Sequence, residues 1–275
     1  MMRVKGVTAL SEVEIVKKAY DNNPAQEWQR LEGFRFEFEI TRHMMHRYLK
    51  KGKVLDIGGG PGRYSIYLAG LGYDVTLVDL SDGNVAFARK KAEEAGVPIR
   101  AFSCDARDLS GLDLGEYDNI LLMGPLYHLF QEADRAKCVL EAKKHLKKDG
   151  LLFASFISIT GGLNYYLDNC PDQLIYEPAM DLFDRMEQDE SWSGTAFTEA
   201  TFINNLEILP FFQRLGFEKL TLFGQEGITA TRLSFLEQAS REVRDKYLEL
   251  SLRLCENPQY FPYSSHMMYI GTMKE

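Results

Sequence analysis

Apolar and polar positions follow two different periods along the middle of the chain. Short runs rich in aliphatic and β-branched residues are typical of buried strands. They occur at 53–57, 74–79, 99–103, 117–123 and 151–157. Segments with helical spacing separate them, at 64–71, 83–95 and 133–146. Parallel strands need long crossover connections, and helices in these positions supply them. The pattern therefore predicts an α/β fold with a doubly wound, mostly parallel sheet and helices on both faces.

The N-terminal flank, residues 1–51, has the pattern of a helical cap. Ser11 suits the cap of a helix whose first turn is acidic, and Pro24 suits the first position of a second helix. Helices are predicted after Ser11, over 25–31 and over 36–49. The alternating core then extends over residues 52–157.

The regular alternation stops after residue 157. Residues 158–200 combine glycines and prolines with aromatic and acidic side chains, and they show no clean strand. A long irregular segment inside a compact domain is usually functional, and its aromatic residues favour order, so we predict a partly helical lid. Residues 201–275 are predicted to complete the core. Their elements are a helix over 202–215, a strand over 217–223, one long helix over 232–256 and a strand over 266–272.

Composition narrows the class of protein. With 275 residues, of which 45% are hydrophobic and 26% charged, the chain has the composition of a soluble globular protein. The formal net charge is −8 and no Lys/Arg block occurs, which disfavours a nucleic-acid substrate. No apolar run predicts a membrane span, and residues 1–10 lack the apolar segment of a signal peptide. The four cysteines are scattered without a C-x-x-C pair, so we expect no metal site, no disulfide and a cytoplasmic location.

A glycine-rich turn follows the first predicted strand and precedes a helix. Gly58, Gly60 and Gly62 are spaced G-x-G-x-G, and glycines permit positive φ and close approach of a ligand. A dinucleotide site requires a third glycine where this chain has Arg63. Asp56 lies two residues before the turn, where a carboxylate would repel a pyrophosphate and suits a cation. The turn therefore favours a cationic ligand without phosphate groups.

The segment Asp56–Gly62 resembles the first signature of the class I S-adenosylmethionine (SAM)-dependent methyltransferases, whose ligand carries a sulfonium and an ammonium group. The resemblance extends over about residues 15–157, and it implies a Rossmann-like core with SAM as cofactor and S-adenosylhomocysteine as product. The last two predicted strands resemble the antiparallel pair that completes the seven-stranded sheet of this family. The block 27–39 resembles the leader of a bacterial small-molecule subgroup, in which such helices fold over the cofactor.

An acid at the end of the second predicted strand follows Gly58 by 21 positions (79 − 58). In the family that the chain resembles, the acid in the place of Asp79 binds both ribose hydroxyls, and Leu80 follows it in the cofactor site. The alternative is that Asp79 caps the next helix, although Ser81 and Asp82 also suit that role.

The segment Cys104–Leu109, after the third predicted strand, resembles the G/C-D-A-x-x-L segment of the same family. The resemblance implies that Asp105 accepts a hydrogen bond from the adenine amino group and that the backbone N–H of Ala106 reaches the ring. The alternative for Asp105 is an acid of a solvated loop. Met123 and Gly124 are implied to lie against the methionine part of SAM, because Gly124 lets the backbone approach closely.

His128 is the sharpest catalytic candidate, with Tyr127 beside it. An alcohol or ammonium acceptor must lose a proton, and histidine titrates in a suitable range. The alternative is that His128 braces its loop by hydrogen bonds, because orientation alone removes much of such a barrier. The segment Gly124–Tyr127 departs from the N/D-P-P-Y/F motif of amide-directed methyltransferases. The other histidines are predicted to be structural or solvated: His43, His46, His145 and His266.

Two residues of the cap are candidates for binding the carboxylate of SAM. Arg30 would pair with it and Tyr20 would donate a hydrogen bond to it. Their alternatives are a core position for Tyr20 and, for Arg30, an ion pair on the helix surface with Glu27.

These features together predict a SAM-dependent methyltransferase that transfers a methyl group to an oxygen or nitrogen nucleophile of a small molecule, without a metal ion and without a membrane partner. The alternatives are an RNA or protein methyltransferase, a non-catalytic SAM-binding protein and a NAD-dependent oxidoreductase. The acids of the lid, with Tyr165 and Trp192 among them, further suggest a cationic or aromatic acceptor. The sequence predicts no oligomeric state.

Overall fold

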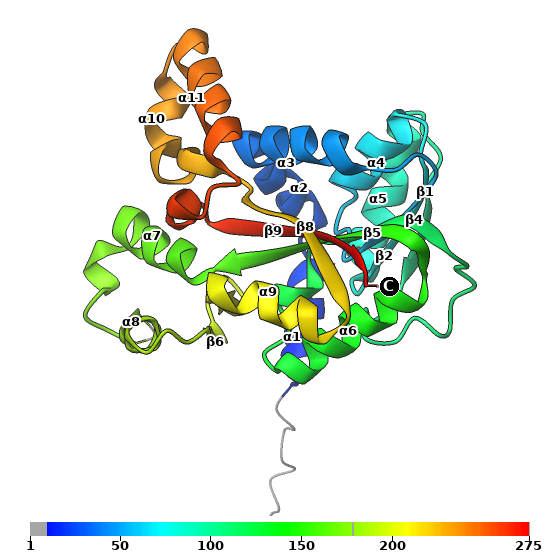
Figure 1. Cartoon of the computed structure of the whole chain (residues 1–275), viewed down its shortest axis with the longest axis horizontal. Coiled ribbons are helices and arrows are strands. Elements are labelled where there is room, and N and C mark those ends of the chain that lie inside the picture. Colours follow the sequence, from blue (N-terminus) through cyan, green and yellow to red (C-terminus); the bar gives the residue numbers. More distant parts are fainter. Residues whose placement is uncertain (1–9, 178, 275) are drawn as a thin grey trace, which may run out of the picture.

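The structure, a computed structural model, describes residues 10–177 and 179–274 (Figure 1). The absence of a signal peptide was expected from residues 1–10, and all but the last of these lie outside the described residues. Within the described part, no helix combines the length and the apolar character needed to cross a bilayer.

One sheet of nine strands organises the described chain. Five parallel strands follow the order β3-β2-β1-β4-β5, and the antiparallel strands β9 and β8 continue the sheet beyond β5. Their bounds are β1 Lys53–Ile57, β2 Asp74–Asp79, β3 Arg100–Ser103, β4 Tyr117–Leu122, β5 Leu146–Ser158, β8 Phe217–Gly224 and β9 His266–Met273. The predicted parallel core and its terminal antiparallel pair are confirmed, although β5 begins five residues earlier than expected.

Two further strands, β6 Trp192–Thr195 and β7 Glu199–Ile203, correct the predictions of seven strands and of a lid without strands. β7 pairs in parallel with the last residues of β5. Ile157 of β5 pairs with β7 on one edge and with His266 of β9 on the opposite edge. The edge that β7 occupies is the one along which β4 runs, and β4 ends at Leu122, before it reaches this part of β5. Every residue of β7 is buried, and a strand buried on both faces shows no alternation in the sequence.

Helices cover both faces of the sheet, as predicted, and α1 begins with the expected cap at Ser11 (Figure 1). One face packs against α3, α4 and α11, and the other packs against α6 and α9. The bounds are α1 Glu12–Asp21, α2 Pro24–Gly33, α3 Arg35–Tyr48, α4 Arg63–Gly70, α5 Asp82–Glu94, α6 Glu132–Lys144, α7 Ile159–Asn169, α8 Ala179–Glu187, α9 Asn205–Arg214, α10 Leu233–Gln238 and α11 Arg241–Leu254.

Two predicted helices have different bounds because a side chain caps each of them later than the apolar pattern indicates. The helix predicted over 202–215 begins only after Asn204, whose side chain accepts a hydrogen bond from a backbone N–H two residues later at 3.0 Å. The helix predicted over 232–256 is divided into α10 and α11. Ser240 caps α11 by accepting a backbone N–H three residues later at 3.3 Å.

The core alternates between the two faces of each strand. Leu55 and Ile57 of β1 pack with α6 and α9, whereas Val54 packs with α3 and α4. This double burial holds the parallel strands in register, so their carboxyl ends form one rigid edge on which loops can build a site.

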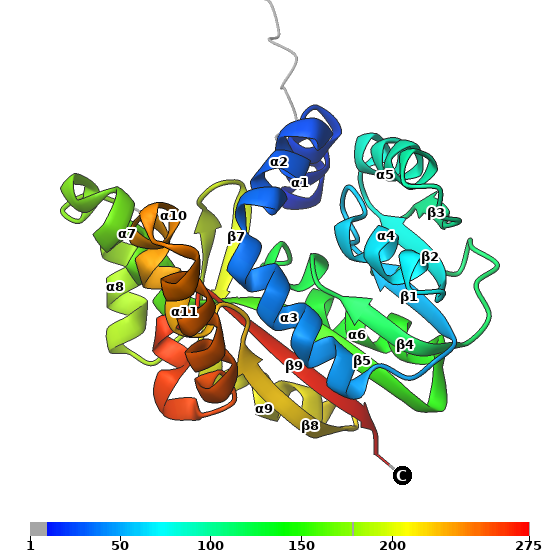
Figure 2. The same ribbon diagram turned by 90° about the horizontal axis from the view of Figure 1, so that it is seen from above.

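The cap is attached to the start of α5, close to that edge (Figure 2). Lys17 contacts Asp21 at 2.9 Å and Asp82 at 2.8 Å. The Asp21 carboxylate also accepts a hydrogen bond from Ser81 Oγ at 2.7 Å. A Cβ on Gly83 would lie 2.4 Å from the Asp21 carbonyl oxygen, so α1 packs directly on the backbone of α5. The division into cap, core, lid and C-terminal part stays a prediction, and β5 and β7 cross its boundaries at residues 157 and 200.

Candidate active site at the carboxyl edge of the sheet

The turn after β1 consists of glycines with positive φ. The φ angles are 73° at Gly58, 56° at Gly60 and 90° at Gly62. A Cβ on Gly58 would lie 2.3 Å from Pro125 Cδ, in the turn after β4. A Cβ on Gly124 would lie 2.7 Å from the Gly58 carbonyl oxygen. The two turns therefore pack backbone against backbone and form the floor of the site.

Gly62 is the one predicted cofactor residue that lines neither of the two cavities described below. It precedes α4, and a Cβ there would lie 3.0 Å from the Cβ of Ala88 in α5. Its position supports close packing of α4 on α5, and its assignment to the cofactor site stays a prediction.

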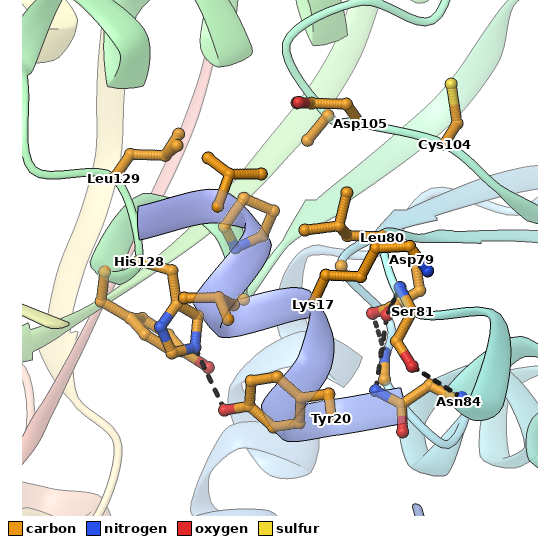
Figure 3. Close-up of a pocket in the computed structure, with 18 of the residues that line it drawn as sticks. Lys17, Tyr20, Asp79, Leu80, Ser81, Asn84, Cys104, Asp105, His128 and Leu129 are labelled. Carbon is orange, nitrogen blue, oxygen red and sulfur yellow. Dashed lines mark hydrogen bonds between the residues drawn. The ribbon is translucent and has the colours of Figure 1, made fainter. Parts of the chain in front are cut away.

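The first cavity, here called the β2 cavity, lies over the carboxyl ends of β1, β2, β3 and β4 beneath α1 (Figure 3). The empty space inside it is about 790 Å³ when the open space at its mouth is included. Ten predicted site residues line it: Tyr20, Gly58, Gly60, Asp79, Leu80, Asp105, Ala106, Gly124, Tyr127 and His128.

Asp79 is held at the end of β2 by donors from its own neighbourhood. Its carboxylate accepts hydrogen bonds from the backbone N–H groups of Gly60 at 2.8 Å and Ser81 at 2.9 Å. Burial raises the pKa of Asp79, and these hydrogen bonds act against the rise. Ser81 caps α5 by accepting a hydrogen bond from the Asn84 backbone N–H at 3.0 Å. The capping role that was the alternative for Asp79 therefore belongs to Ser81. Asn84 Oδ1 is buried with no hydrogen-bond partner among the described residues, which leaves an acceptor beside Asp79.

Asp105, after β3, is paired with Arg107. The guanidinium donates to the carboxylate through Nη2 at 2.7 Å and through Nε at 3.1 Å, and the Arg107 backbone N–H donates at 2.9 Å. Partial burial acts to raise the pKa of Asp105, but Arg107 outweighs it and the pKa lies below its ordinary value. Asp105 is therefore a carboxylate at neutral pH, and a ligand amino group would share it with Arg107.

His128 lies between the cap and the lid (Figure 3). Its Nδ1 is 2.8 Å from the carbonyl oxygen of Glu199, which only accepts, so Nδ1 carries the proton. In the neutral ring Nε2 is then an acceptor, and Tyr20 Oη donates to it at 3.1 Å. Burial lowers the pKa of His128 to about 4. Both ring nitrogens thus form hydrogen bonds, as the alternative role of His128 in bracing its loop requires. A role for His128 as a base stays a prediction.

The second cavity, here called the β5 cavity, lies on the other side of the glycine turn, over the carboxyl ends of β1, β4 and β5 and the start of β9. Six predicted site residues line it: Arg30, Asp56, Gly58, Gly60, Met123 and Tyr127. Because Gly58, Gly60 and Tyr127 line both cavities, the two spaces share a wall at the centre of the sheet edge.

Arg30 forms the ion pair that was its alternative role. Its Nε and Nη2 donate to the two carboxylate oxygens of Glu27 at 2.8 Å and 2.6 Å. The Arg30 side chain is 48% exposed, and Phe34 lies under its guanidinium at 5.0 Å. Glu27 lines both cavities, so this pair is part of their common roof.

Asp56 is buried beneath the glycine turn. Ser65 Oγ donates to its carboxylate at 2.7 Å, and a Cβ on Gly59 would lie 2.8 Å from it. Burial raises the pKa of Asp56 to about 7. A cation bound in the β5 cavity would lower that pKa by stabilising the carboxylate.

Besides Glu27 and Arg63, five polar residues of the β5 cavity were not among the predicted site residues: Glu37, Tyr64, Ser155, Gln225 and His266. Tyr64 Oη donates to Glu37 Oε1 at 2.6 Å, and Gln225 Nε2 donates to the same oxygen at 3.0 Å. Ser155 Oγ donates to Gln225 Oε1. These residues come from α3, α4, β5 and the segments around β8 and β9, so no local motif joins them.

The acids of the lid are not part of either cavity. Trp192 packs on Phe202 and donates through Nε1 to Asp181 at 2.8 Å, and Asp181 also lies 3.7 Å from Arg185. Tyr165 is 58% exposed on α7. Within residues 10–177 and 179–274, no group of three or more histidine, cysteine or acidic side chains is arranged to hold a metal ion.

Fold and site together define a class: a Rossmann-like α/β protein with acid-lined cavities at the carboxyl edge of its sheet. Comparison with known proteins agrees with this class. Residues 54–150 match the family described as "Methyltransferase domain". The chain is 30% identical to glycine/sarcosine N-methyltransferase of Parasynechococcus marenigrum over 52% of each protein. It is 29% identical to ubiquinone biosynthesis O-methyltransferase of Rickettsia akari over 48% of this chain and 51% of that protein.

Among solved structures, the magnesium protoporphyrin IX methyltransferase of Synechocystis with bound S-adenosylhomocysteine superposes with a TM-score of 0.59 at 15% identity, covering 96% of this chain and 100% of that one. This likeness concerns the fold. The chain spans about half the length of the curated relatives named above. Residues 54–150 are therefore similar to a methyltransferase domain, and the chain shares the fold of this methyltransferase structure.

Proposed function

We propose that this protein binds SAM at the carboxyl edge of the sheet and transfers its methyl group to an oxygen or nitrogen atom of a small molecule. One observation carries the proposal. Acids at the ends of β2 and β3 share a cavity with the glycine turn of β1, and this cavity adjoins a second one over β4, β5 and β9. A ligand that is long, cationic and free of phosphate fits such a site.

The residues present suit SAM. Gly58 and Gly60 expose backbone at positive φ, and Asp79 with the unpaired Asn84 Oδ1 provides acceptors for ribose hydroxyls. Asp105 and Ala106 line the same cavity, on the side of β3. When bound, SAM supplies an electrophilic methyl group on a positively charged sulfur atom. The nearby carboxylates favour that charge, whereas they would repel a pyrophosphate.

The order of the strands gives the ligand a direction. If the ribose lies at β2 and the adenine at β3, the methionine part extends past Gly58 and Gly60 toward β4. The methyl group then points into the β5 cavity, so we assign that cavity to the acceptor. Arg30, in the common roof, and Tyr20, in the wall of the β2 cavity, are the candidates for the methionine carboxylate, and Arg30 would have to leave Glu27 in part to bind it.

A small acceptor is favoured over a macromolecule. Helices α1 and α2 line the β2 cavity, α2 and α3 line the β5 cavity, and the net charge of −8 opposes a nucleic-acid backbone. The relatives named above are called glycine/sarcosine and ubiquinone-biosynthesis methyltransferases, which supports a metabolite with an amine or a hydroxyl group. The four cysteines are unpaired in the structure, which supports a reducing, cytoplasmic location.

Calorimetric titration of the full chain with SAM, S-adenosylhomocysteine and NAD tests the cofactor. We expect binding of the first two and none of NAD; binding of NAD alone would replace this proposal by an oxidoreductase. Transfer of tritium from methyl-labelled SAM to sarcosine, to a catechol and to a bacterial metabolite extract then tests the activity. Tight SAM binding with no label transferred to any of these would leave a SAM-binding protein without methyltransferase activity.

A further inference from the structure

A glutamate–histidine pair stands at the β5 cavity, formed by residues 40 positions apart in the chain. His266 is the first residue of β9, and Glu226 follows β8. Glu226 Oε1 lies 2.5 Å from His266 Nδ1, and Glu226 Oε2 accepts from the His266 backbone N–H at 3.0 Å. Both carboxylate oxygens therefore act on one residue, and they fix the orientation of its ring.

The other ring nitrogen, Nε2, is not engaged by Glu226. His266 lines the β5 cavity and its side chain is 23% exposed, while Glu226 is 3% exposed behind it. Phe34 packs against the ring edge to face at 6.4 Å. Among the described residues, Nε2 has no hydrogen-bond partner, in contrast to both ring nitrogens of His128. Because Nδ1–H is committed to Glu226, the lone pair of the neutral ring is at Nε2.

The charges around His266 suit a base near neutral pH. Burial and Arg30 of α2 act to lower its pKa, but Glu226 and then Glu37 of α3 outweigh them, so the pKa is raised. This is the opposite of His128, whose pKa burial lowers to about 4. The other ionisable groups that line the cavity are Glu27, Asp56, Arg63, Tyr64 and Tyr127.

We propose that His266 is the general base of the transfer reaction, with Glu226 as its positioning residue, for an acceptor that bears a proton on its nucleophilic oxygen or nitrogen. This inference rests on the proposed function. The acceptor gives its proton to Nε2 while its lone pair forms the bond to the methyl carbon, and the electron pair of the broken carbon–sulfur bond stays on sulfur. His266 becomes an imidazolium ion, which Glu226 stabilises, and it later releases the proton to water.

Substitution of the base separates catalysis from cofactor binding. In the tritium-transfer assay, with sarcosine, a catechol and the metabolite extract as acceptors, His266→Gln should lower kcat by about 10²- to 10⁴-fold. Its affinity for S-adenosylhomocysteine should stay within about threefold, which also verifies that the variant is folded. His43→Gln, at an exposed histidine of α3, is the matched control and should keep full activity. A fully active His266→Gln enzyme overturns the inference and leaves the proposed function intact.

The pH dependence tests the pair in a way that a structural role does not. Because the His266 pKa is raised, the neutral base accumulates only above about pH 6.5, so kcat should fall on the acidic side with a midpoint above that value. Glu226→Gln keeps the size of the side chain and removes its charge. It should move this midpoint to lower pH and reduce the maximal rate.

Histidine NMR provides a readout that does not depend on turnover. In protein labelled with ¹⁵N-histidine, one ring should titrate above pH 6.5, vanish in His266→Gln and move to lower pH in Glu226→Gln. The inference is overturned if Glu226→Gln does not shift the pH at which kcat falls on the acidic side. It is also overturned if the His266 ring titrates below pH 6.5. Absence of any label transfer by the unsubstituted protein instead counts against the proposed function itself.

Discussion

The β2 cavity and the β5 cavity differ in how their residues are encoded. In the β2 cavity, the acids and glycines follow the ends of successive parallel strands, so their spacing in the chain marks their place in the site. In the β5 cavity, the polar residues come from α2, α3, α4, β1, β5 and β9, from the turn after β4 and from the segment after β8. The residues of the β2 cavity can therefore be recognised from local sequence motifs, whereas those of the β5 cavity are brought together by the packing of distant segments. Under the proposed function, the β2 cavity would hold SAM and the β5 cavity would hold the acceptor.

The largest effect is expected from the floor that the two cavities share. Gly58→Ala places a Cβ 2.3 Å from Pro125 Cδ at a positive φ, so overpacking and backbone strain should together lower the unfolding free energy by roughly 2–5 kcal/mol. Denaturant unfolding measures this loss. Gly72→Ala is the control, because its φ is also positive but nothing lies within 4 Å of the new Cβ. Equal losses in the two variants would show that the shared floor has no packing constraint.

Asp56, which is buried beneath the glycine turn, should make the unfolding free energy depend on pH. Its folded pKa of about 7 lies above the ordinary 3.8, so the folded state binds the extra proton and the unfolding free energy falls as pH rises from about 4 to 7. The contribution is on the order of 4 kcal/mol. Asp56→Asn should remove this part of the decline, and SAM should reduce it in the unsubstituted protein. Chemical unfolding at a series of pH values measures both, and an unchanged profile would contradict the raised pKa.

Asp79→Ala tests the β2 cavity alone. Loss of hydrogen bonds between a carboxylate and ribose hydroxyls should weaken SAM binding by about 1.5–3 kcal/mol, or roughly 10- to 150-fold. Calorimetry measures the change. Asp74→Ala, at the exposed start of the same strand, should leave the affinity unaltered. An Asp79→Ala variant with unaltered affinity would remove this acid from the cofactor site.

The smallest effect is expected at the contact between α1 and the lid side of the site. Tyr20→Phe removes the donor to His128 Nε2 and should lower the unfolding free energy by about 0.5–1.5 kcal/mol. If His128 only braces its loop, Tyr20→Phe combined with His128→Ala should cost no more stability than His128→Ala alone, and label transfer should change little. A large fall in kcat for His128→Ala with retained SAM affinity would instead make His128 a second catalytic residue.

The sequence by itself determined the parallel core and most of the β2 cavity, because both depend on short-range patterns. Strand periodicity, the glycine turn and the acids at the ends of the second and third strands are local, and parallel strands bring their carboxyl ends to one edge without further information. Among the predicted residues, Asp79, Asp105 and Gly58 meet there for this reason.

Only the tertiary structure decided the rest. Residues 199–203 form the strand β7 because β5 extends past β4 and offers a free edge. The apolar pattern within 199–203 does not predict this pairing. His266 looks like an ordinary strand residue until the turn after β8 brings Glu226 against it. Both outcomes depend on contacts between segments far apart in the chain, and such contacts form only when the apolar faces of the helices and strands are packed together.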